Sequence, residues 1–136
     1  MTDHGDWNAG IIKEFRENSG KVAAFGRQPL LLLHTTGARS GETRVKLLAY
    51  LADGDRLYVF ASMGGGPNNP AWYHNILANP KVRVELGTET FDAVATKIIG
   101  AERDEVYARQ AAFNPNFAGY QEKTTRIIPV ISLTRA

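Results

Sequence analysis

The sequence predicts a small β-barrel of antiparallel strands with helices packed on its outside. The first observation is a series of short apolar and β-branched runs of strand length, separated by tight turns. The second is that the first three runs, between residues 30 and 61, have no helical segment between them. Parallel strands need crossover helices, so a doubly wound parallel sheet is disfavoured. We expect six or seven strands and three or four helices.

Composition and charge indicate one globular domain. The 136 residues are 43% hydrophobic and 22% charged, which suits a single core. A net charge of only +2 argues against nucleic-acid binding, and the absence of cysteine excludes disulfides and thiolate metal sites. We find neither a signal peptide nor an apolar run of membrane-spanning length. We therefore expect a cytoplasmic protein with a mobile tail over residues 1–9 and one domain over residues 10–136.

An amphipathic helix is expected over residues 10–25. Ile11, Ile12, Phe15 and Val22 recur at three- and four-residue spacing, which places them on one face. The simplest interpretation is a helix packed on the barrel. Two alternatives stay open: a flap over a ligand site, or a peripheral contact with the inner face of the cell membrane.

The first strands follow this helix. Residues 30–35 are apolar without alternation, which predicts a strand buried on both faces. After a turn bounded by two glycines, residues 43–52 form the return strand. An Asp-Gly pair within residues 53–55 predicts a hairpin turn, because such turns need a residue with positive φ. Residues 56–61 are the third strand.

Residues 62–69 are expected to form an irregular loop, since three consecutive glycines and a proline prevent regular structure. Asn69 is the expected N-cap, and Pro70 the first residue, of a short helix that ends near residues 79–80. The remaining expected elements are strands at 81–86 and 89–99, helices at 101–113 and 117–123, and a closing strand at 127–133.

A basic turn follows the first strand. Arg39 and Arg44 offer two guanidinium groups, Ser40 and Thr43 two hydroxyls, and the flanking glycines expose backbone N–H groups. Forked cationic donors and accessible amides are typical of phosphate sites. The alternative is a solvated hairpin tip with ordinary arginines. The turn is neither a Walker loop nor a dinucleotide fingerprint.

The Gly-rich loop and the helix after it are the second candidate region. The loop presents backbone amides that can bind the polar edge of a ring, and Ser62 adds a hydroxyl. The alternative is a flexible linker. Core packing explains at least one of Trp72 and Tyr73, and stacking beside a flat ligand would explain the other.

Other catalytic sites find no support in the sequence. His4, His34 and His74 lie far apart without the spacing of metal ligands, so we expect no metal. Ser62 lies outside any nucleophile elbow, and no pair of carboxylates occurs in the Gly-rich region. A site of amides, cations, hydroxyls and aromatics is typical of proteins whose cofactor carries the chemistry.

The chain resembles the deazaflavin-dependent nitroreductases and quinone reductases, which use coenzyme F420. The likeness extends over nearly the whole chain, and a Thr-Thr-Gly turn at residues 35–37 together with Asn-Pro-Ala-Trp-Tyr at residues 69–73 is its most specific part. Further matching motifs are Glu14-Phe15-Arg16, Gly20-Lys21-Val22, Ser40-Gly41, Leu77-Ala78-Asn79-Pro80, Gly100-Ala101-Glu102-Arg103 and Ile128-Pro129-Val130. The resemblance implies a split β-barrel like that of the FMN-binding pyridoxamine-phosphate oxidases.

The resemblance also implies residue roles. The basic turn would hold the phosphate and polyglutamate tail, the strand at 46–50 and residues 71–75 would flank the deazaflavin, and residues 62–65 would contact its rings. The implied cofactor-binding residues are His34, Arg39, Ser40, Gly41, Thr43, Arg44, Val45, Lys46, Leu47, Leu48, Ala49, Tyr50, Ala61, Ser62, Met63, Gly64, Gly65, Ala71, Trp72, Tyr73, His74 and Asn75. Ser62 and Tyr120 are the implied catalytic residues: Tyr120 would lie over the substrate, and Ser62, Tyr120 or water would deliver the proton.

The implied activity is hydride transfer from reduced coenzyme F420 to a quinone or nitroaromatic acceptor. Some positions depart from the family pattern: Ala38 replaces a frequent basic residue, and Ala49, Asn114 and Phe117 replace tyrosines of some members. The substrate therefore stays open. The alternatives are an FMN-dependent reductase on the same barrel and a barrel that binds a cofactor or lipid without turnover. A homodimer also stays open.

Overall fold

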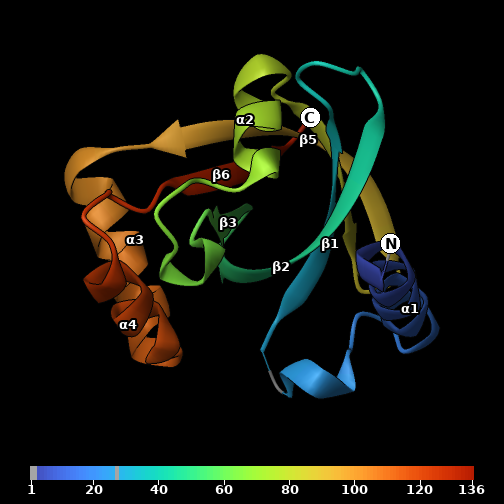
Figure 1. Ribbon diagram of the computed structural model, residues 1–136, viewed down its shortest axis with the longest axis horizontal. Coiled ribbons are helices and arrows are strands. Elements are labelled where there is room, and N and C mark those ends of the chain that lie inside the picture. Colours follow the sequence, from blue (N-terminus) through green and yellow to red (C-terminus); the bar gives the residue numbers. More distant parts are fainter. Residues whose placement is uncertain (1–2, 27) are drawn as a thin grey trace.

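Six antiparallel strands close into a barrel in the order β1-β2-β3-β6-β5-β4, which confirms the predicted fold class (Figure 1). The computed structural model describes residues 3–26 and 28–136. The strands are β1 (Leu30–Thr36), β2 (Thr43–Asp53), β3 (Arg56–Phe60), β4 (Lys81–Leu86), β5 (Glu89–Ile98) and β6 (Val130–Arg135). The helices are α1 (Asp3–Glu17), α2 (Ala71–Ala78), α3 (Gly100–Phe113) and α4 (Asn116–Lys123), with 3-10 turns η1 (Ala23–Phe25) and η2 (Met63–Gly65).

Strand alternation fills the interior of the barrel. Leu31 and Leu33 of β1 point inward and meet inward-facing residues of the other strands. Helix α2 contributes Trp72, Tyr73 and Ile76 to the same cluster. The interior is therefore a packed core, and a ligand site must lie at its edge.

Helices cover two sides of the barrel (Figure 1). Ile11 and Phe15 of α1 pack on Leu30 and Leu32, so β1 is buried on both faces, as the unbroken apolar run predicted. Helices α3 and α4 cover β3 and β6 on another side. No described helix is long and apolar enough to cross a membrane.

The first helix differs from its prediction at both ends. It begins at Asp3, inside the segment expected to be a tail, of which residues 1 and 2 lie outside the described residues. It ends at Glu17 instead of residue 25, because Ser19 and Gly20 adopt positive φ angles of 55° and 97°. Gly20 also lies against the β4–β5 turn, where an added Cβ would stand 3.1 Å from the Cα of Gly87. The close approach explains why the chain must turn at a glycine here.

Two other predicted boundaries are wrong for the same reason: a hydrogen bond from a distant side chain occupies a polar group that the prediction assigned to the helix cap or to the strand. Asn69 does not cap α2, because its Oδ1 accepts a hydrogen bond from Arg126 Nη1 at 2.7 Å. Strand β6 begins at Val130 instead of residue 127, since Gln121 and Arg103 bind the N–H and C=O of Ile128. These backbone groups therefore cannot join the sheet.

Candidate functional site

A cavity of about 1140 Å³, here called the main cavity, lies among the β1–β2 turn, strand β2, the Gly-rich loop and the start of α2. Its lining residues are Thr35, Gly37, Ala38, Arg39, Ser40, Arg44, Val45, Lys46, Leu48, Phe60, Ser62, Met63, Gly64, Pro70, Ala71, Trp72, His74 and Asn75. Ligand pockets commonly span about 300–1,000 Å³, so the main cavity has room for a large flat cofactor. The structure thus brings together the two regions that the sequence singled out.

The β1–β2 turn presents cations to this cavity. Arg39, Arg44 and Lys46 line it, and no acidic side chain does so in the part of the chain that the structure describes. Arg44 forms a 3.3 Å ion pair with Glu42, but both side chains are more than 60% exposed, so solvent weakens this pair. An anion in the cavity can therefore bind Arg44 with only a small loss of free energy from the broken Glu42 ion pair.

Helix α2 fixes the position of this turn. The N–H of Ala38 donates to Asn75 Oδ1 at 3.0 Å, and Asn75 Nδ2 donates to Thr35 Oγ1 at 3.2 Å. Within the turn, the N–H of Glu42 donates to Ser40 Oγ at 3.1 Å. That hydroxyl lies only 2.5 Å from the place where a Cβ on Gly37 would stand, so any larger residue at position 37 would displace the Ser40 side chain.

Ser62, Met63 and Gly64 of the Gly-rich loop line the cavity. Ser62 has a right-handed conformation, and Met63, Gly64 and Gly65 follow with φ angles of 49°, 63° and 82°. A right-handed residue followed by a left-handed one brings successive N–H groups together and favours anions and other acceptors. Among the described residues, no acceptor pairs with the N–H of Met63 or Gly64. These two donors are therefore available to a ligand.

Apolar side chains complete the lining. Trp72, 6% exposed, and Phe60 belong to the cores below the cavity and also border it. Tyr73 is 5% exposed, lies in the interior core and does not line the cavity. Core packing therefore explains Tyr73, whereas Trp72 is the one of the pair that a ligand can contact.

Strand alternation separates the expected residues of β2. Lys46 and Leu48 line the main cavity, whereas Leu47 and Ala49 point to the other face and pack against the α1 cluster. Tyr50 borders a different cavity of about 540 Å³, and burial raises its pKa. Of residues 46–50, which were all expected to line the cofactor site, only Lys46 and Leu48 line the main cavity.

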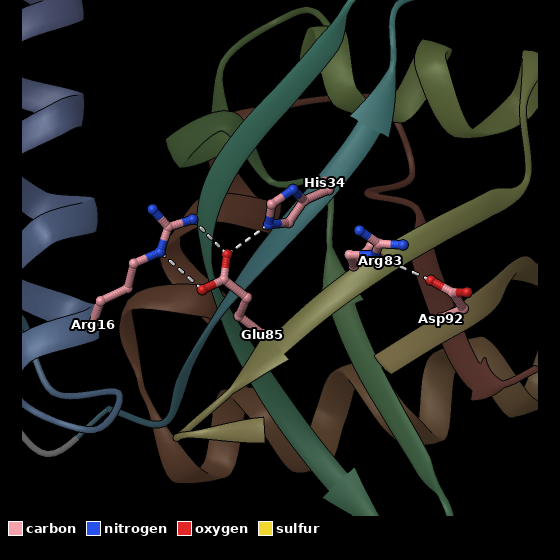
Figure 2. Close-up of polar contacts among 5 residues, drawn as sticks. All are labelled: Arg16, His34, Arg83, Glu85 and Asp92. Atoms are coloured by element: carbon pink, nitrogen blue, oxygen red, sulfur yellow. Dashed lines mark hydrogen bonds and ion pairs between the residues drawn. The ribbon is translucent and has the colours of Figure 1, made fainter. Parts of the chain in front are cut away.

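His34 lies on the outer face of the barrel (Figure 2). Its Nε2 is 2.6 Å from Glu85 Oε2, and Arg16 donates two further hydrogen bonds to the same carboxylate at 2.9 and 2.7 Å. The hydrogen bonds from Arg16, with that from His34, lower the pKa of Glu85 to about 2 against the opposing effect of burial. An ionised carboxylate can only accept, so Nε2 of His34 carries a hydrogen.

His34 shares a second cavity of about 530 Å³ with Thr43 and with Arg83, which pairs with Asp92 at 3.2 Å. This cavity and the main cavity both border Thr35, which is 2% exposed and lies near the β1–β2 turn. His34 and Thr43 are thus near the main cavity but outside its lining.

The other expected residues outside the lining support the Gly-rich loop or the basic turn. Gly41 closes the turn by donating its N–H to the carbonyl of Gly37 at 3.0 Å, and Ala61 is fully buried in the interior core. Gly65 lies under α4, where an added Cβ would stand 2.7 Å from the carbonyl oxygen of Tyr120. The ring of Tyr120 packs edge-on against Phe117 with centroids 5.2 Å apart.

Sequence reasoning missed five lining residues. Thr35, Gly37, Ala38, Phe60 and Pro70 flank the segments that the sequence singled out, and adjacency in the chain is the signal that would have found them. Among the described residues, no group of three or more histidines and carboxylates is arranged to hold a metal ion.

Comparisons with known proteins show the family of this chain. Residues 10–135 match the family model described as F420H2-dependent quinone reductase. An F420H2-dependent quinone reductase of Mycobacterium tuberculosis is 41% identical over 126 residues, which cover 89% of this chain and 85% of that protein. Another M. tuberculosis protein, named as a putative F420H2-dependent quinone reductase, is 33% identical over 77% of this chain and 88% of its own length.

Solved structures give the same result. A structure described as an F420H2-dependent reductase has a TM-score of 0.71 and 38% identity, covering 77% of this chain and 93% of its own. A structure described as a domain-swapped dimer has a TM-score of 0.73 and 32% identity, over 95% and 98% of the two chains. A putative pyridoxamine 5′-phosphate oxidase from Listeria innocua, at 13% identity and a TM-score of 0.59 over 83% and 88%, shares the fold. The chain therefore belongs to the F420H2-dependent quinone reductase family, the family that its motifs resemble.

Proposed function

We propose that this chain transfers a hydride from coenzyme F420, bound in the main cavity, to a quinone. Family membership makes the chain an oxidoreductase with coenzyme F420 as its cofactor. The observation that carries the proposed site is the joining of three cationic side chains and two unpaired amide N–H groups around one large cavity. The acceptor is the substrate in the relatives' names, and we extend it to this chain.

The residues present fit this cofactor. Its phosphate and glutamates need cationic donors, which Arg39 and Arg44 supply at the turn. Its ring system has polar acceptor edges, which suit the N–H groups of Met63 and Gly64. When bound in reduced form, the cofactor supplies the hydride.

The protein's own contributions are orientation, exclusion of water and a hydrogen-bond donor. Asn75 ties the basic turn to α2, the helix that follows the Gly-rich loop in the chain, and this tie helps to set the positions of tail and ring relative to each other. Leu48, Phe60 and Trp72 present apolar surface that keeps water from the reacting faces. The Ser62 hydroxyl borders the cavity without a partner among the described residues, so we propose it as the donor to a reacting oxygen.

Two further proposals concern Tyr120 and the oligomeric state. The backbone of Tyr120 in α4 lies against Gly65 of the Gly-rich loop, and this proximity supports Tyr120 as a substrate contact. A homodimer is proposed from the domain-swapped relative. The apolar face of α1 gives no support to a membrane contact, because Ile11 and Phe15 are 7% and 0% exposed against the barrel.

Turnover tests the proposed function. Purified protein mixed with reduced coenzyme F420 and menadione is expected to regenerate the visible absorbance of the oxidised cofactor. A nitroaromatic in place of menadione tests the breadth of the acceptor site, and FMN with a nicotinamide reductant tests the alternative cofactor. Absence of acceleration with every quinone offered would contradict the proposal.

A further inference from the structure

We propose that Arg126 is a positioning residue, which holds the Gly-rich loop so that its amide N–H groups face the main cavity. This inference rests on the proposed function, because it concerns how the loop meets the cofactor ring. Arg126 lies in the segment between α4 and β6, about 60 positions along the chain from the loop. It does not line the main cavity itself.

The guanidinium group of Arg126 binds four acceptors of one loop. Its Nε donates to the carbonyl oxygen of Gly66 at 3.0 Å, and Nη2 donates to that of Ser62 at 2.7 Å. Nη1 donates to the carbonyl oxygen of Ala61 at 3.1 Å and to Asn69 Oδ1 at 2.7 Å. One planar side chain therefore ties together both ends and the centre of the loop.

Hydrogen bonding to Arg126 distinguishes the carbonyl groups of the loop from its N–H groups. Carbonyl oxygens of Ala61, Ser62 and Gly66 are directed to Arg126, whereas the N–H groups of Met63 and Gly64 have no acceptor among the described residues. Two backbone hydrogen bonds hold the turns of the loop, from the N–H of Gly65 to the carbonyl oxygen of Ser62 at 2.9 Å and from the N–H of Gly66 to that of Met63 at 3.0 Å, whereas Arg126 is the side chain that binds the carbonyl oxygens of Ala61, Ser62 and Gly66 together. If the carbonyls rotated toward the cavity, they would repel the acceptor edge of a bound ring.

The charge of Arg126 is also directed at this loop. It forms no ion pair with an acidic side chain in the described part of the chain. Its partners are neutral oxygens, so a positive charge stands behind the amide groups and strengthens them as donors. An arginine suits this place better than a lysine, because its rigid fork reaches several acceptors at once.

The segment that carries Arg126 is itself fixed. Gln121 Nε2 of α4 donates to the carbonyl oxygen of Arg126 at 2.8 Å, and Gln121 Oε1 accepts from Arg103 Nη2 at 2.7 Å. Arg103 also donates twice to the carbonyl oxygen of Ile128, at 3.1 and 2.9 Å. Hydrogen bonds from α3 and α4 thus hold the segment of Arg126 in place, and Arg126 in turn holds the Gly-rich loop.

Measuring the binding of two ligands distinguishes this role from the role of the basic turn, because the basic turn is proposed to bind only the anionic tail, which one of the two ligands lacks. The ligands are oxidised coenzyme F420 and its tail-less form, a deazaflavin with the ribityl chain but without phosphate and glutamates. Arg126→Ala is expected to weaken both by a similar factor of about ten or more in a fluorescence titration, because the ring contact is lost. Equal affinity of wild type and Arg126→Ala for the tail-less form would overturn the inference.

Chemical rescue supplies a readout that general damage to the fold would not produce. Guanidinium chloride at a non-denaturing concentration is expected to restore tail-less binding in Arg126→Ala and to leave wild type unchanged. Propylammonium at the same concentration carries the charge without the fork and is expected to restore little. Failure of guanidinium to restore binding would overturn the proposal.

A second variant covers the case in which Arg126→Ala does not fold. Arg126→Lys keeps the charge but cannot reach four acceptors, so its affinity for the tail-less deazaflavin is expected to fall. Its melting temperature is expected to stay within a few degrees of wild type. Unaltered affinity for the tail-less deazaflavin would overturn the inference. Wild-type protein that binds neither ligand would overturn the proposed function as well. Wild-type binding with unaffected Arg126 variants would overturn the positioning role alone.

Discussion

Gln110 of α3 is fully buried, and neither its Nε2 nor its Oε1 has a hydrogen-bond partner among the described residues. An unpaired buried amide destabilises the folded state, so Gln110→Met is expected to raise the free energy of unfolding by about 1–2 kcal/mol. Urea denaturation measures this change. The matched control is Gln121→Met, which removes hydrogen bonds to Arg103, Ile128 and Arg126 and should lower stability by a similar amount. A loss of stability in Gln110→Met would show that this amide has a partner.

Glu85 makes the stability of the α1 attachment depend on pH. Its pKa in the folded protein is about 2, below the usual 4.5, so its stabilising contribution is present above the usual value and is lost as pH falls toward 2. Glu85→Gln is expected to cost about 1–2 kcal/mol at pH 7, a modest value because Arg16 is half exposed. Denaturation at about pH 7 and about pH 3 should show the gap between wild type and variant narrowing in acid. A gap of constant size would contradict this assignment.

At the scale of elements, α4 rests on the Gly-rich loop at Gly65. An added Cβ there would stand 2.7 Å from Tyr120 O and 3.0 Å from the Cβ of Lys123, at a φ of 82°. Gly65→Ala is therefore expected to lower the free energy of unfolding by at least about 2 kcal/mol. Gly64→Ala is the matched control, because Gly64 has a φ of 63° but nothing within 4 Å, and should cost about 1 kcal/mol. Equal costs for both variants, measured by urea denaturation, would show that packing of α4 on the loop contributes nothing.

Elements with a clear hydrophobic period were the ones that sequence predicted best. Strand β4 has the predicted bounds, because Val82 and Val84 alternate with charged residues and Pro80 precedes the strand. The ends of α1 and β6 were missed because they depend on contacts between distant segments. The region of α1 ends at a left-handed turn, where Gly20 lies against Gly87. Strand β6 begins later than predicted because Arg103 and Gln121 bind the backbone of Ile128.

At the scale of the whole molecule, sequence located the segments of the site better than its individual residues. The basic turn, the Gly-rich loop and the start of α2 do meet in one cavity, because the β1–β2 hairpin and α2 share hydrogen bonds through Asn75. Leu47 and Ala49 were included although strand alternation turns them away. Arg126 carries no local motif, and only the closed barrel brings it to the loop.

The central claim is that one cavity holds the anionic tail of coenzyme F420 at Arg39 and Arg44 and its ring at the Gly-rich loop. The most direct measurement is a titration of oxidised coenzyme F420 into wild type, into Arg39→Gln with Arg44→Gln, and into a control with the same change in charge. The control is Arg56→Gln with Arg109→Gln, which removes two exposed arginines paired with Glu102 and Asp53. We expect affinity to fall about 100-fold in the first variant and to stay near wild type in the control. Equal affinities in all three proteins would contradict the account.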